Sequence, residues 1–567
     1  MAASSKKRVF NFNVGVLGHV DSGKTSLSKV LSTVASTASF DNNPQSRERG
    51  ITLDLGFSSF CVDVPDHLQD LVTSYDKIQY TLVDCPGHAS LIRTIIGGAQ
   101  IIDLMLLVVD VTKGMQTQTA ECLIIGEITC PRMMVVLNKI DLLPVDKRPL
   151  AIEKMRKRML KTLEGTRFAD CPVVAVASKP GGQESDEHEP MAVVELIEAL
   201  RNNTYIPDRS TGGPFVFAVD HCFSIRGQGV VMTGTVLHGA VEINDMIEIP
   251  SINENKKVKS IQMFKQPVER IVQGDRAGIC VTQFDPKELE RGLVCNPGSL
   301  PTLQAAIVCV NQIAYYRGKI CSKAKFHITI SHETVMGRLT FFGYHKNSGS
   351  NTPITDVTNF DFTQEYTYQE ELLSKPKAAA AQDEPFPDKQ FALIEFEKPV
   401  TCPHHCVVIG SKLDTDIHTN SCRIAFHGTL LEGITDVKYK EVVLPKIKIY
   451  KTKLKEGQVE RVSDEYTVIG KNLFKKETNL QIFTGLKVSL SSGQEGMIEG
   501  GFGQSGKIRI RIPNGLPADI VQRFSGTKRK NKGKVVEENT SQDQEPIKIF
   551  LSFKRYLFDP EKSLKQL

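Results

Sequence analysis

The segment Gly18-His-Val-Asp-Ser-Gly-Lys-Thr25 constrains the fold more than any other part of the chain. It fits G-x-x-x-x-G-K-[ST] and directly follows an apolar run with strand composition, Asn13-Val-Gly-Val-Leu17. Backbone N–H groups at the start of the following helix would wrap phosphates, Lys24 would reach the β- and γ-phosphate oxygens, and Thr25 would coordinate Mg2+. The predicted phosphate-binding residues are Gly18, Asp21, Ser22, Gly23, Lys24, Thr25 and Ser26.

A second motif, Asp84-Cys-Pro-Gly-His88, ends the strand-like run Tyr80-Thr-Leu-Val-Asp84. A carboxylate at the carboxyl end of a parallel strand lies beside the phosphate loop, where it can hold Mg2+ through water. Gly87 can contact a γ-phosphate through its backbone N–H. His88 is then placed to orient an attacking water.

A third motif, Asn138-Lys139-Ile140-Asp141, predicts the choice of base. A carboxylate accepts hydrogen bonds from both N1–H and the 2-amino group of guanine, and adenine offers no such pair of donors. Asp141 therefore selects GTP, and loss of the double contact discriminates strongly against other bases. Ser178 and Lys179 follow the next apolar run, where a backbone contact to guanine O6 is expected.

The order of apolar runs predicts four domains in the 567 residues. Residues 9–207 alternate strand-like and helix-like segments, which indicates an α/β domain with a parallel sheet. Residues 208–301 and 302–435 read as two β-barrels, the second interrupted by a mobile insertion between Gly343 and Pro387. Residues 436–567 form a β-rich fourth domain that contains a loop of disordered composition, Gly526–Gln544.

Charge is unevenly distributed along the chain. Lys438–Leu567 holds 26 basic and 15 acidic residues, a net charge of +11, which leaves 44 basic and 50 acidic residues elsewhere, a net charge of −6. A basic C-terminal domain suggests docking to a polyanion, and a solvated basic surface is the alternative. The 13 scattered cysteines and the absence of a long apolar segment predict reduced thiols in the cytoplasm and no membrane insertion. Lys528-Arg-Lys530 could direct the protein to the nucleus as well.

The four motifs, in this order, resemble those of the regulatory GTPases. Arg47-Glu-Arg-Gly-Ile-Thr52 is similar to the first switch of the translational GTPases, and by this resemblance Thr52 closes on Mg2+ when γ-phosphate is present. The Asp84–His88 motif is also typical of translation factors.

Longer segments resemble the selenocysteine-specific elongation factors, most closely the eukaryotic form. They are Arg49–Phe57, Val83–Thr119, Phe223–Thr235, Ser331–Leu339 and Phe553–Pro560. The resemblance implies an α/β P-loop GTPase domain followed by two β-barrels, as in elongation factor Tu, and a C-terminal β-rich fourth domain. Bacterial members end in winged helices that read an mRNA hairpin, and this chain shows no helix-dominated end. In the eukaryotic family a separate hairpin-binding protein supplies that link, so the resemblance implies such a partner, docked on the fourth domain.

The resemblance also implies an aminoacyl pocket in the first barrel, residues 208–301. Asp220, His221 and Arg276 are the candidates, with Arg276 and His221 attracting a selenolate and Asp220 keeping His221 protonated. A salt bridge that braces two barrel strands is the alternative interpretation.

The implied function is delivery of selenocysteinyl-tRNA to the ribosome at UGA codons, with GTP hydrolysis to GDP and phosphate triggered by the ribosome, by a monomer that uses Mg2+ with GTP. Three alternatives remain at this point: a γ-type initiation factor subunit carrying initiator tRNA, the GTPase subunit of sulfate adenylylation, and a GTP-gated RNA scaffold. Cys402-Pro-His-His-Cys406, with His418 and Cys422, is a weaker candidate for a zinc site, and we favour an ordinary barrel loop there.

Overall fold

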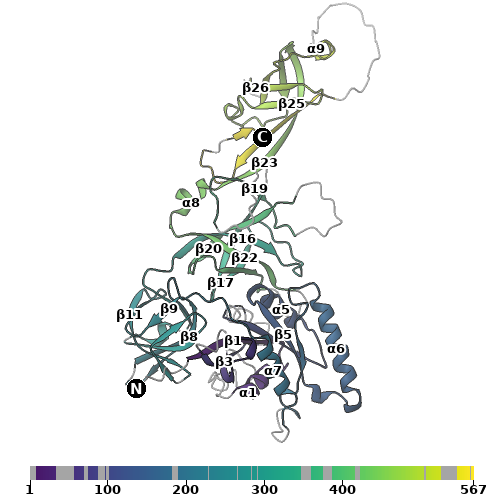
Figure 1. Ribbon diagram of the computed structural model, residues 1–567. Coiled ribbons are helices and arrows are strands. Elements are labelled where there is room, and N and C mark those ends of the chain that lie inside the picture. The colour runs from purple at the N-terminus through teal and green to yellow at the C-terminus, as the bar shows by residue number, and fades with distance from the viewer. Residues whose placement is uncertain are drawn as a thin grey trace, which may run out of the picture.

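The computed structural model describes residues 8–32, 56–68, 75–86, 96, 101–181, 189–227, 229–264, 266–282, 284–289, 291–345, 359–374, 386–414, 422–503, 506–524, 546–561 and 564–566. Figure 1 shows four units. An α/β domain and a first barrel lie side by side, a second barrel sits across both, and a C-terminal barrel extends away at the far end. The order of strands and helices along the chain confirms the predicted fold class.

The α/β domain is built on a six-stranded sheet of order β2-β3-β1-β4-β5-β6, parallel except for β2. Both faces of this sheet are buried, as β4 shows. Met105 and Leu107 face one core, while Leu106 and Val108 face the other. Helices α5 and α6 cover the first face, and α1 and α7 cover the second. The elements are β1 (Arg8–Gly18), α1 (Lys24–Leu31), β2 (Gly56–Asp63), β3 (Tyr75–Asp84), β4 (Leu104–Asp110), α5 (Thr117–Thr129), β5 (Arg132–Asn138), α6 (Arg148–Leu163), β6 (Val173–Ala175) and α7 (Val193–Asn203).

The first barrel closes because β10 pairs with β11 as well as with β15, which completes the ring β10-β15-β7-β8-β14-β11. Closure leaves no free strand edges in the ring and fills its interior with side chains. The strands are β7 (Val216–Ile225), β8 (Gly229–His238), β9 (Ala240–Glu242), β10 (Met246–Ile249), β11 (Glu254–Met263), β12 (Gln266–Val268), β13 (Arg270–Val272), β14 (Arg276–Val281) and β15 (Gly292–Cys295).

The second barrel closes in the same way, through a pairing of β17 with β18 that completes the ring β17-β21-β22-β16-β20-β18. Its own core is rich in Phe, Ile and Val side chains. The strands are β16 (Thr302–Gln312), β17 (Lys325–Ile330), β18 (Glu333–Tyr344), β20 (Lys389–Thr401), β21 (Val407–Ser411) and β22 (Ile424–Ile434).

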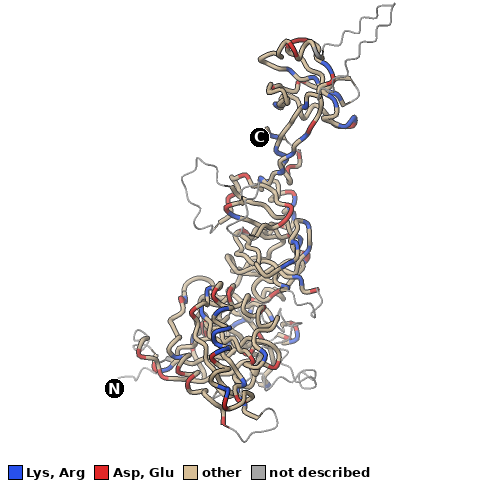
Figure 2. The backbone as a smooth tube through the Cα atoms, turned by 90° about the vertical axis from the view of Figure 1, so that its right-hand side faces the viewer, with Lys and Arg blue, Asp and Glu red and all other residues tan. Residues whose placement is uncertain are grey.

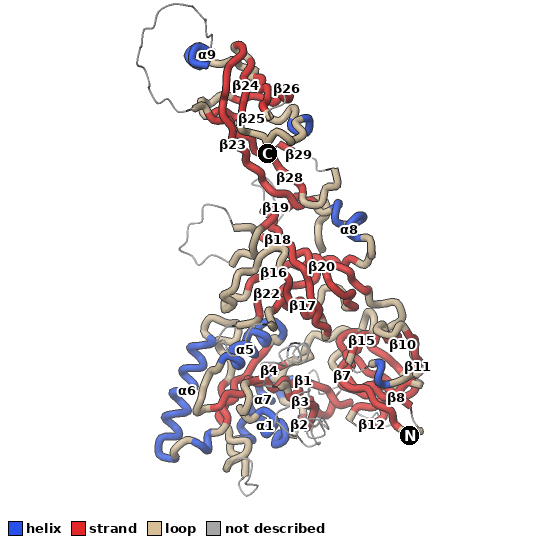
Figure 3. Tube along the Cα trace, turned by 180° about the vertical axis from the view of Figure 1, so that it is seen from behind, coloured by secondary structure: helices blue, strands red, loops and turns tan. Residues whose placement is uncertain are grey.

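The C-terminal barrel is the ring β23-β24-β27-β26-β25-β28, closed by pairing of β23 with β28. Figure 3 shows that strands dominate this end of the molecule, as the sequence predicts. The elements are α8 (Tyr439–Val442), β23 (Lys448–Asp464), β24 (Thr467–Lys471), β25 (Lys487–Leu490), β26 (Glu495–Phe502), β27 (Lys507–Arg511), α9 (Ala518–Phe524), β28 (Lys548–Tyr556) and β29 (Leu564–Gln566).

Strand β19 (Glu365–Gln369) joins the last two barrels, since it pairs antiparallel with β18 and parallel with β23. Glu365 accepts hydrogen bonds from Lys554 (2.6 Å) and from Tyr556 of β28. Part of the segment that we expected to be a mobile insertion, residues 359–374, is therefore packed structure. The expectation was wrong there because β19 finds two strand partners, one of them distant in sequence. Residues 346–358 and 375–385, which include Lys377–Ala381, lie outside the described residues.

The predicted domain limits fall between elements. Residue 207 lies between α7 and β7, residue 301 between β15 and β16, and residue 435 between β22 and α8. The loop predicted at Gly526–Gln544 lies outside the described residues. Within the described residues, no helix has the length and apolar character needed to cross a bilayer.

Candidate nucleotide and aminoacyl sites

The phosphate-loop segment leaves β1 at Gly18 and enters α1 at Lys24. Gly23 adopts φ +87°, and a Cβ there would lie 2.2 Å from Asn138 Nδ2, so the position requires glycine. Lys24 is buried, its ammonium donates to the His19 carbonyl (2.7 Å), and burial lowers its pKa. An ammonium at the start of a helix adds its charge to the positive end of the helix, and the two together are suited to phosphate oxygens.

Thr25 and Asp84 meet beside this loop. The Thr25 hydroxyl donates to Asp84 Oδ2 (2.7 Å), and Asp84 is 1% exposed at the end of β3. Its other oxygen, Oδ1, is buried without a hydrogen-bond partner in the described structure. Burial raises the pKa of Asp84, although Thr25 and Lys24 oppose the shift. A buried carboxylate oxygen without a partner, next to a hydroxyl, fits the hard oxygen ligands of Mg2+.

Asn138 fastens the base-reading segment to the phosphate loop. Its Nδ2 donates to the Ser22 carbonyl (2.9 Å) and to Ser178 Oγ (3.1 Å). Its Oδ1 accepts from the backbone N–H groups of Lys139 (2.9 Å) and Ser178 (3.1 Å). Since the side chain is fully buried, each polar atom needs these partners, and three sequence-distant segments are fixed together.

The two residues that flank Ile140 are placed differently. Lys139 has φ +64° and its ammonium lies 3.0 Å from Asp110 Oδ2, which orients the start of the loop. Asp141 is half-buried, and its Oδ2 accepts from the Gly181 N–H (3.4 Å). Lys179 is also half-buried and lies between Ser178 and Gly181 in sequence. The Asp141 carboxylate thus remains near the surface, where a base can reach it.

The structure brings together the predicted residues of three motifs: the phosphate loop including Ser26 at the first turn of α1, Asp84, and the pair Asn138 and Ser178. Thr52, Gly87 and His88 lie outside the described residues, so their roles stay predictions.

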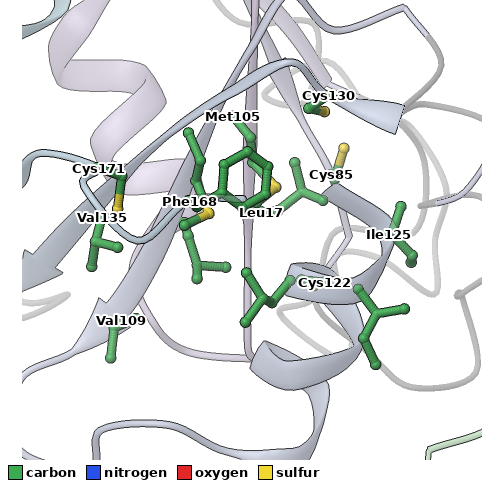
Figure 4. Close-up of a cluster of buried hydrophobic side chains, with 14 of the residues drawn as sticks. Leu17, Cys85, Met105, Val109, Cys122, Ile125, Cys130, Val135, Phe168 and Cys171 are labelled. Atoms are coloured by element: carbon green, nitrogen blue, oxygen red, sulfur yellow. The ribbon is translucent and has the colours of Figure 1, made fainter. Parts of the chain in front are cut away.

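Helix α5 lies against the phosphate loop and is part of a buried cluster shown in Figure 4. Gln118 Oε1 accepts from the Val20 N–H (3.5 Å), and the Cys122 thiol bonds to the Gly18 backbone. Burial raises the pKa of Cys122 to about 11, so this thiol stays protonated at neutral pH. The turn of α5 from Gln118 to Cys122 therefore packs against the phosphate loop and stabilises it.

In the first barrel, Arg276 on β14 and Asp220 on β7 form a buried ion pair. The Arg276 NH1 donates to Asp220 Oδ2 (2.5 Å) and to Thr235 Oγ1 (3.3 Å). The two residues are 7% and 9% exposed, and the pairing register shifts between Val219 and His221, which makes Asp220 a bulge residue. Burial lowers the pKa of Arg276, while Asp220 opposes the shift.

His221 occupies the next position of β7 and is half-buried. Its carbonyl accepts from Thr233 Oγ1 (3.4 Å), and it pairs with Thr233 in the ladder. The structure thus pairs the Asp220 carboxylate with Arg276 rather than with the His221 imidazole. Two of the three predicted pocket residues, Asp220 and Arg276, are in contact, and the third, His221, follows Asp220 on β7.

Two contacts of these sites were missed by sequence reasoning. Asp110 holds Lys139, and it could have been found because it ends an apolar strand just as Asp84 does. Phe57, on β2 of the α/β domain, covers Arg276 with its ring. No sequence signal marks that residue, since an aromatic side chain in a strand is ordinary core composition.

The weaker zinc candidate lacks a ligand set in the described residues, where no group of three or more His, Cys, Asp and Glu side chains is placed to hold a metal ion. A hydrogen bond between the Cys402 and Cys406 thiols, together with burial, raises the pKa of Cys402. His418 lies outside the described residues.

Comparison with protein families matches every domain. The α/β domain matches the elongation factor Tu GTP binding domain over residues 10–206, and the first barrel matches elongation factor Tu domain 2 over residues 229–295. The nucleotide site and this domain order together define a translational GTPase, so GTP hydrolysis is the expected activity.

The last two domains specify which translational GTPase it is. Residues 307–428 match the third domain of the eukaryotic selenocysteine-specific elongation factor, and residues 445–562 match the eEFSec C-terminal RIFT domain. The selenocysteine-specific elongation factor of Mus musculus is 56% identical over 582 residues, covering 99% of both chains. The chain belongs to the selenocysteine-specific elongation factor family.

An archaeal relative and a solved structure agree. The selenocysteine-specific elongation factor of Methanocaldococcus jannaschii is 31% identical over 503 residues, covering 88% of this chain and 93% of its own length. The crystal structure of translation elongation factor SelB from Methanococcus maripaludis in complex with the GTP analogue GPPNHP is 25% identical, with a TM-score of 0.66 and coverage of 97% and 99%. These findings support an elongation factor and not the γ-type initiation factor subunit.

Proposed function

We propose that this chain, as a complex with GTP and Mg2+, binds selenocysteinyl-tRNA and delivers it to the ribosome at UGA codons. The observation that carries the proposal is the buried guanidinium of Arg276 in the wall of the first barrel, held by Asp220. A buried, oriented cation in a domain of this family is suited to recognising an anionic group at the end of an aminoacyl-tRNA.

The charge of the amino acid supplies the selectivity. A selenol is more acidic than a thiol and is largely anionic at neutral pH, whereas the serine hydroxyl on the same tRNA is neutral. Arg276 and His221 would therefore attract a selenolate and give serine no equivalent gain. Asp220 holds the guanidinium in place and offsets part of its positive charge, so the half-buried His221 would supply a second donor to the selenolate.

The residues of the α/β domain would hold the nucleotide. Backbone N–H groups of the loop before α1 and the Lys24 ammonium bind phosphates, and Asp141 reads the guanine edge. Thr25 and Asp84, joined by Thr52, would hold Mg2+, and the partnerless Asp84 Oδ1 supports this assignment. When bound, Mg2+ supplies neutralisation of phosphate charge.

Hydrolysis would depend on positioning. His88 would orient the attacking water once ribosomal contacts place its side chain, and no covalent intermediate is needed. Intrinsic turnover is therefore slow, and the ribosome accelerates it.

The C-terminal barrel is the proposed dock for an mRNA-hairpin-binding protein. Figure 2 shows Lys and Arg at many positions along this barrel, in keeping with the net positive charge of this end of the chain. We further propose that the protein acts as a monomer, in the cytoplasm and also in the nucleus.

The test is binding of the GTP-loaded protein to one tRNA charged with selenocysteine or with serine, beside initiator methionyl-tRNA. The proposal expects a strong preference for the selenocysteinyl form that weakens in Arg276→Ala. Because that change leaves Asp220 buried without a partner, the double variant Asp220→Asn with Arg276→Met is the better folded companion. Equal binding of the seryl form by the unaltered protein would disprove the charge-based pocket, and preference for the initiator tRNA would disprove the delivery role.

A further inference from the structure

The Arg276 guanidinium is enclosed by two domains. Asp220 and Thr235 hold its NH1 from within the first barrel. On the other side, the Phe57 ring of the α/β domain lies over it, with Arg276 Cζ 3.1 Å from the ring centroid. Phe57 is 3% exposed, so the contact is shielded from water. A cation against an aromatic face is attracted by the ring quadrupole, and more strongly when water is excluded.

Phe57 also lies close to the nucleotide site, because its strand pairs with the strand that ends at Asp84. Strand β2 pairs with β3 so that Gly56 lies opposite Asp84 and Phe57 opposite Val83. Asp84 in turn accepts the hydrogen bond from Thr25 of the phosphate loop. The residue that covers the barrel cation is thus one strand position away from the candidate Mg2+ ligand.

Phe57 follows Thr52 by five positions in the sequence, so β2 begins close to the predicted first switch. Because β2 follows the switch directly in the chain, a change in the position of the switch can change the position of β2. A shift of β2 relative to the first barrel would take the ring off the guanidinium and admit water to the charge. Water weakens the attraction between a guanidinium and an anion, because the local dielectric constant rises.

We propose that Phe57 is a positioning residue that couples the nucleotide state to recognition of the aminoacyl group by Arg276. This inference rests on the proposed function, since it concerns the same pocket. In the position of β2 that the structure shows, the ring orients and desolvates Arg276, which strengthens the attraction of a selenolate, and we assign this position to the GTP-bound state. By thermodynamic linkage, selenocysteinyl-tRNA must then favour the same position of β2 and hence GTP over GDP.

A neighbouring phenylalanine provides a matched control. Phe60 is on the same strand and equally buried at 3% exposed, but it lies in the opposite core of the sheet, against Tyr80. Phe57→Leu and Phe60→Leu each replace one aromatic ring in β2 by an aliphatic side chain. Only the first removes a ring from Arg276.

The experiment measures the dissociation constants of selenocysteinyl- and seryl-tRNA in the presence of a GTP analogue and of GDP, for the unaltered protein and both variants. We expect Phe57→Leu to lower the selectivity for selenocysteinyl- over seryl-tRNA about tenfold. The ratio of selenocysteinyl-tRNA affinities with the GTP analogue and with GDP should fall by a similar factor. Affinity for GTP without tRNA should match that of Phe60→Leu. Phe57→Met carries the same expectation and replaces the leucine variant if that one folds poorly.

The outcomes separate the two proposals. Unchanged selectivity in the Phe57 variants, with a selective parent protein, would overturn the coupling and leave the delivery function in place. Equal losses in the Phe57 and Phe60 variants would also overturn it, because a general weakening of the strand would explain them. A parent protein without selectivity for the selenocysteinyl form would overturn both.

Discussion

The Glu121 carboxylate of α5 and the Arg423 guanidinium of the second barrel form a buried ion pair, with Arg423 NH2 2.7 Å from Glu121 Oε2. The Arg423 Nε (3.0 Å) and backbone N–H (3.2 Å) both bond to Oε1. Each residue is 5% exposed. Since Gln118 of the same helix contacts the Val20 N–H, α5 connects the phosphate loop to the second barrel.

Breaking this pair on one side should be costly. Arg423→Met leaves a buried carboxylate without its partner, and we expect a loss of about 3–5 kcal/mol. The double variant Glu121→Gln with Arg423→Met should recover most of it, because no buried charge remains. Thermal unfolding midpoints compare the variants. The exposed Lys325–Glu397 pair is the control, where Lys325→Met should cost no more than about 1 kcal/mol. A similar shift in both single variants would contradict the expectation.

The Asp84 carboxyl should make the stability of the metal-free protein fall with rising pH. Burial raises its pKa in the folded state, so the folded protein holds this proton over a range of pH in which the unfolded chain has already lost it. The unfolded state binds fewer protons there, and stability declines as the pH rises through the folded pKa. Asp84→Asn should remove that decline and also weaken Mg2+-dependent GTP binding.

Unfolding midpoints from about pH 4 to pH 8 with a chelator, for the unaltered protein and Asp84→Asn, check this prediction. Added Mg2+ should raise the midpoint of the unaltered protein more than that of the variant. Parallel pH profiles for the unaltered protein and Asp84→Asn would contradict the prediction, because they would show that the Asp84 pKa is the same in the folded and unfolded states.

Asp141→Asn should change the base that the protein selects. An asparagine amide cannot accept from both guanine donors, and it can donate to the 2-oxo group of xanthine instead. We expect GTP affinity to fall by about a hundredfold or more and xanthosine triphosphate to become the preferred ligand. Competition binding measures the ratio. Asp146→Asn, at an exposed position five residues further on, should leave it unchanged, and the assignment of Asp141 fails if both variants keep GTP preference.

His88→Ala should separate binding from hydrolysis. GTP and tRNA affinities should be retained, while ribosome-stimulated phosphate release falls by about a hundredfold or more because water is no longer oriented. The exposed His67, whose ring nitrogen bonds to the Thr204 carbonyl, provides the control as His67→Ala. Comparable loss of nucleotide affinity in His88→Ala would refute the catalytic role.

The sequence predicted well wherever the determining interactions are local. The phosphate loop was recognisable because Gly23 needs a left-handed backbone and Lys24 and Thr25 follow it in a fixed spacing. The four-part fold class followed from the spacing of apolar runs and is confirmed by the structure. The same reasoning failed for β19, because its alternation of polar and aromatic residues is only five residues long and nothing in it identifies β18 and β23 as partners.

By itself, then, the sequence determined the domain classes, the nucleotide motifs and the family of the protein, because each depends on residue types at short, fixed spacings. Only the tertiary structure decided that Asp220 pairs with Arg276, that Phe57 covers the same guanidinium and that Glu121 meets Arg423. The two ion pairs join residues that are 56 and 302 positions apart in the sequence. Contacts of that kind arise from how closed barrels and a sheet pack against one another, and no local pattern of charges or rings encodes them.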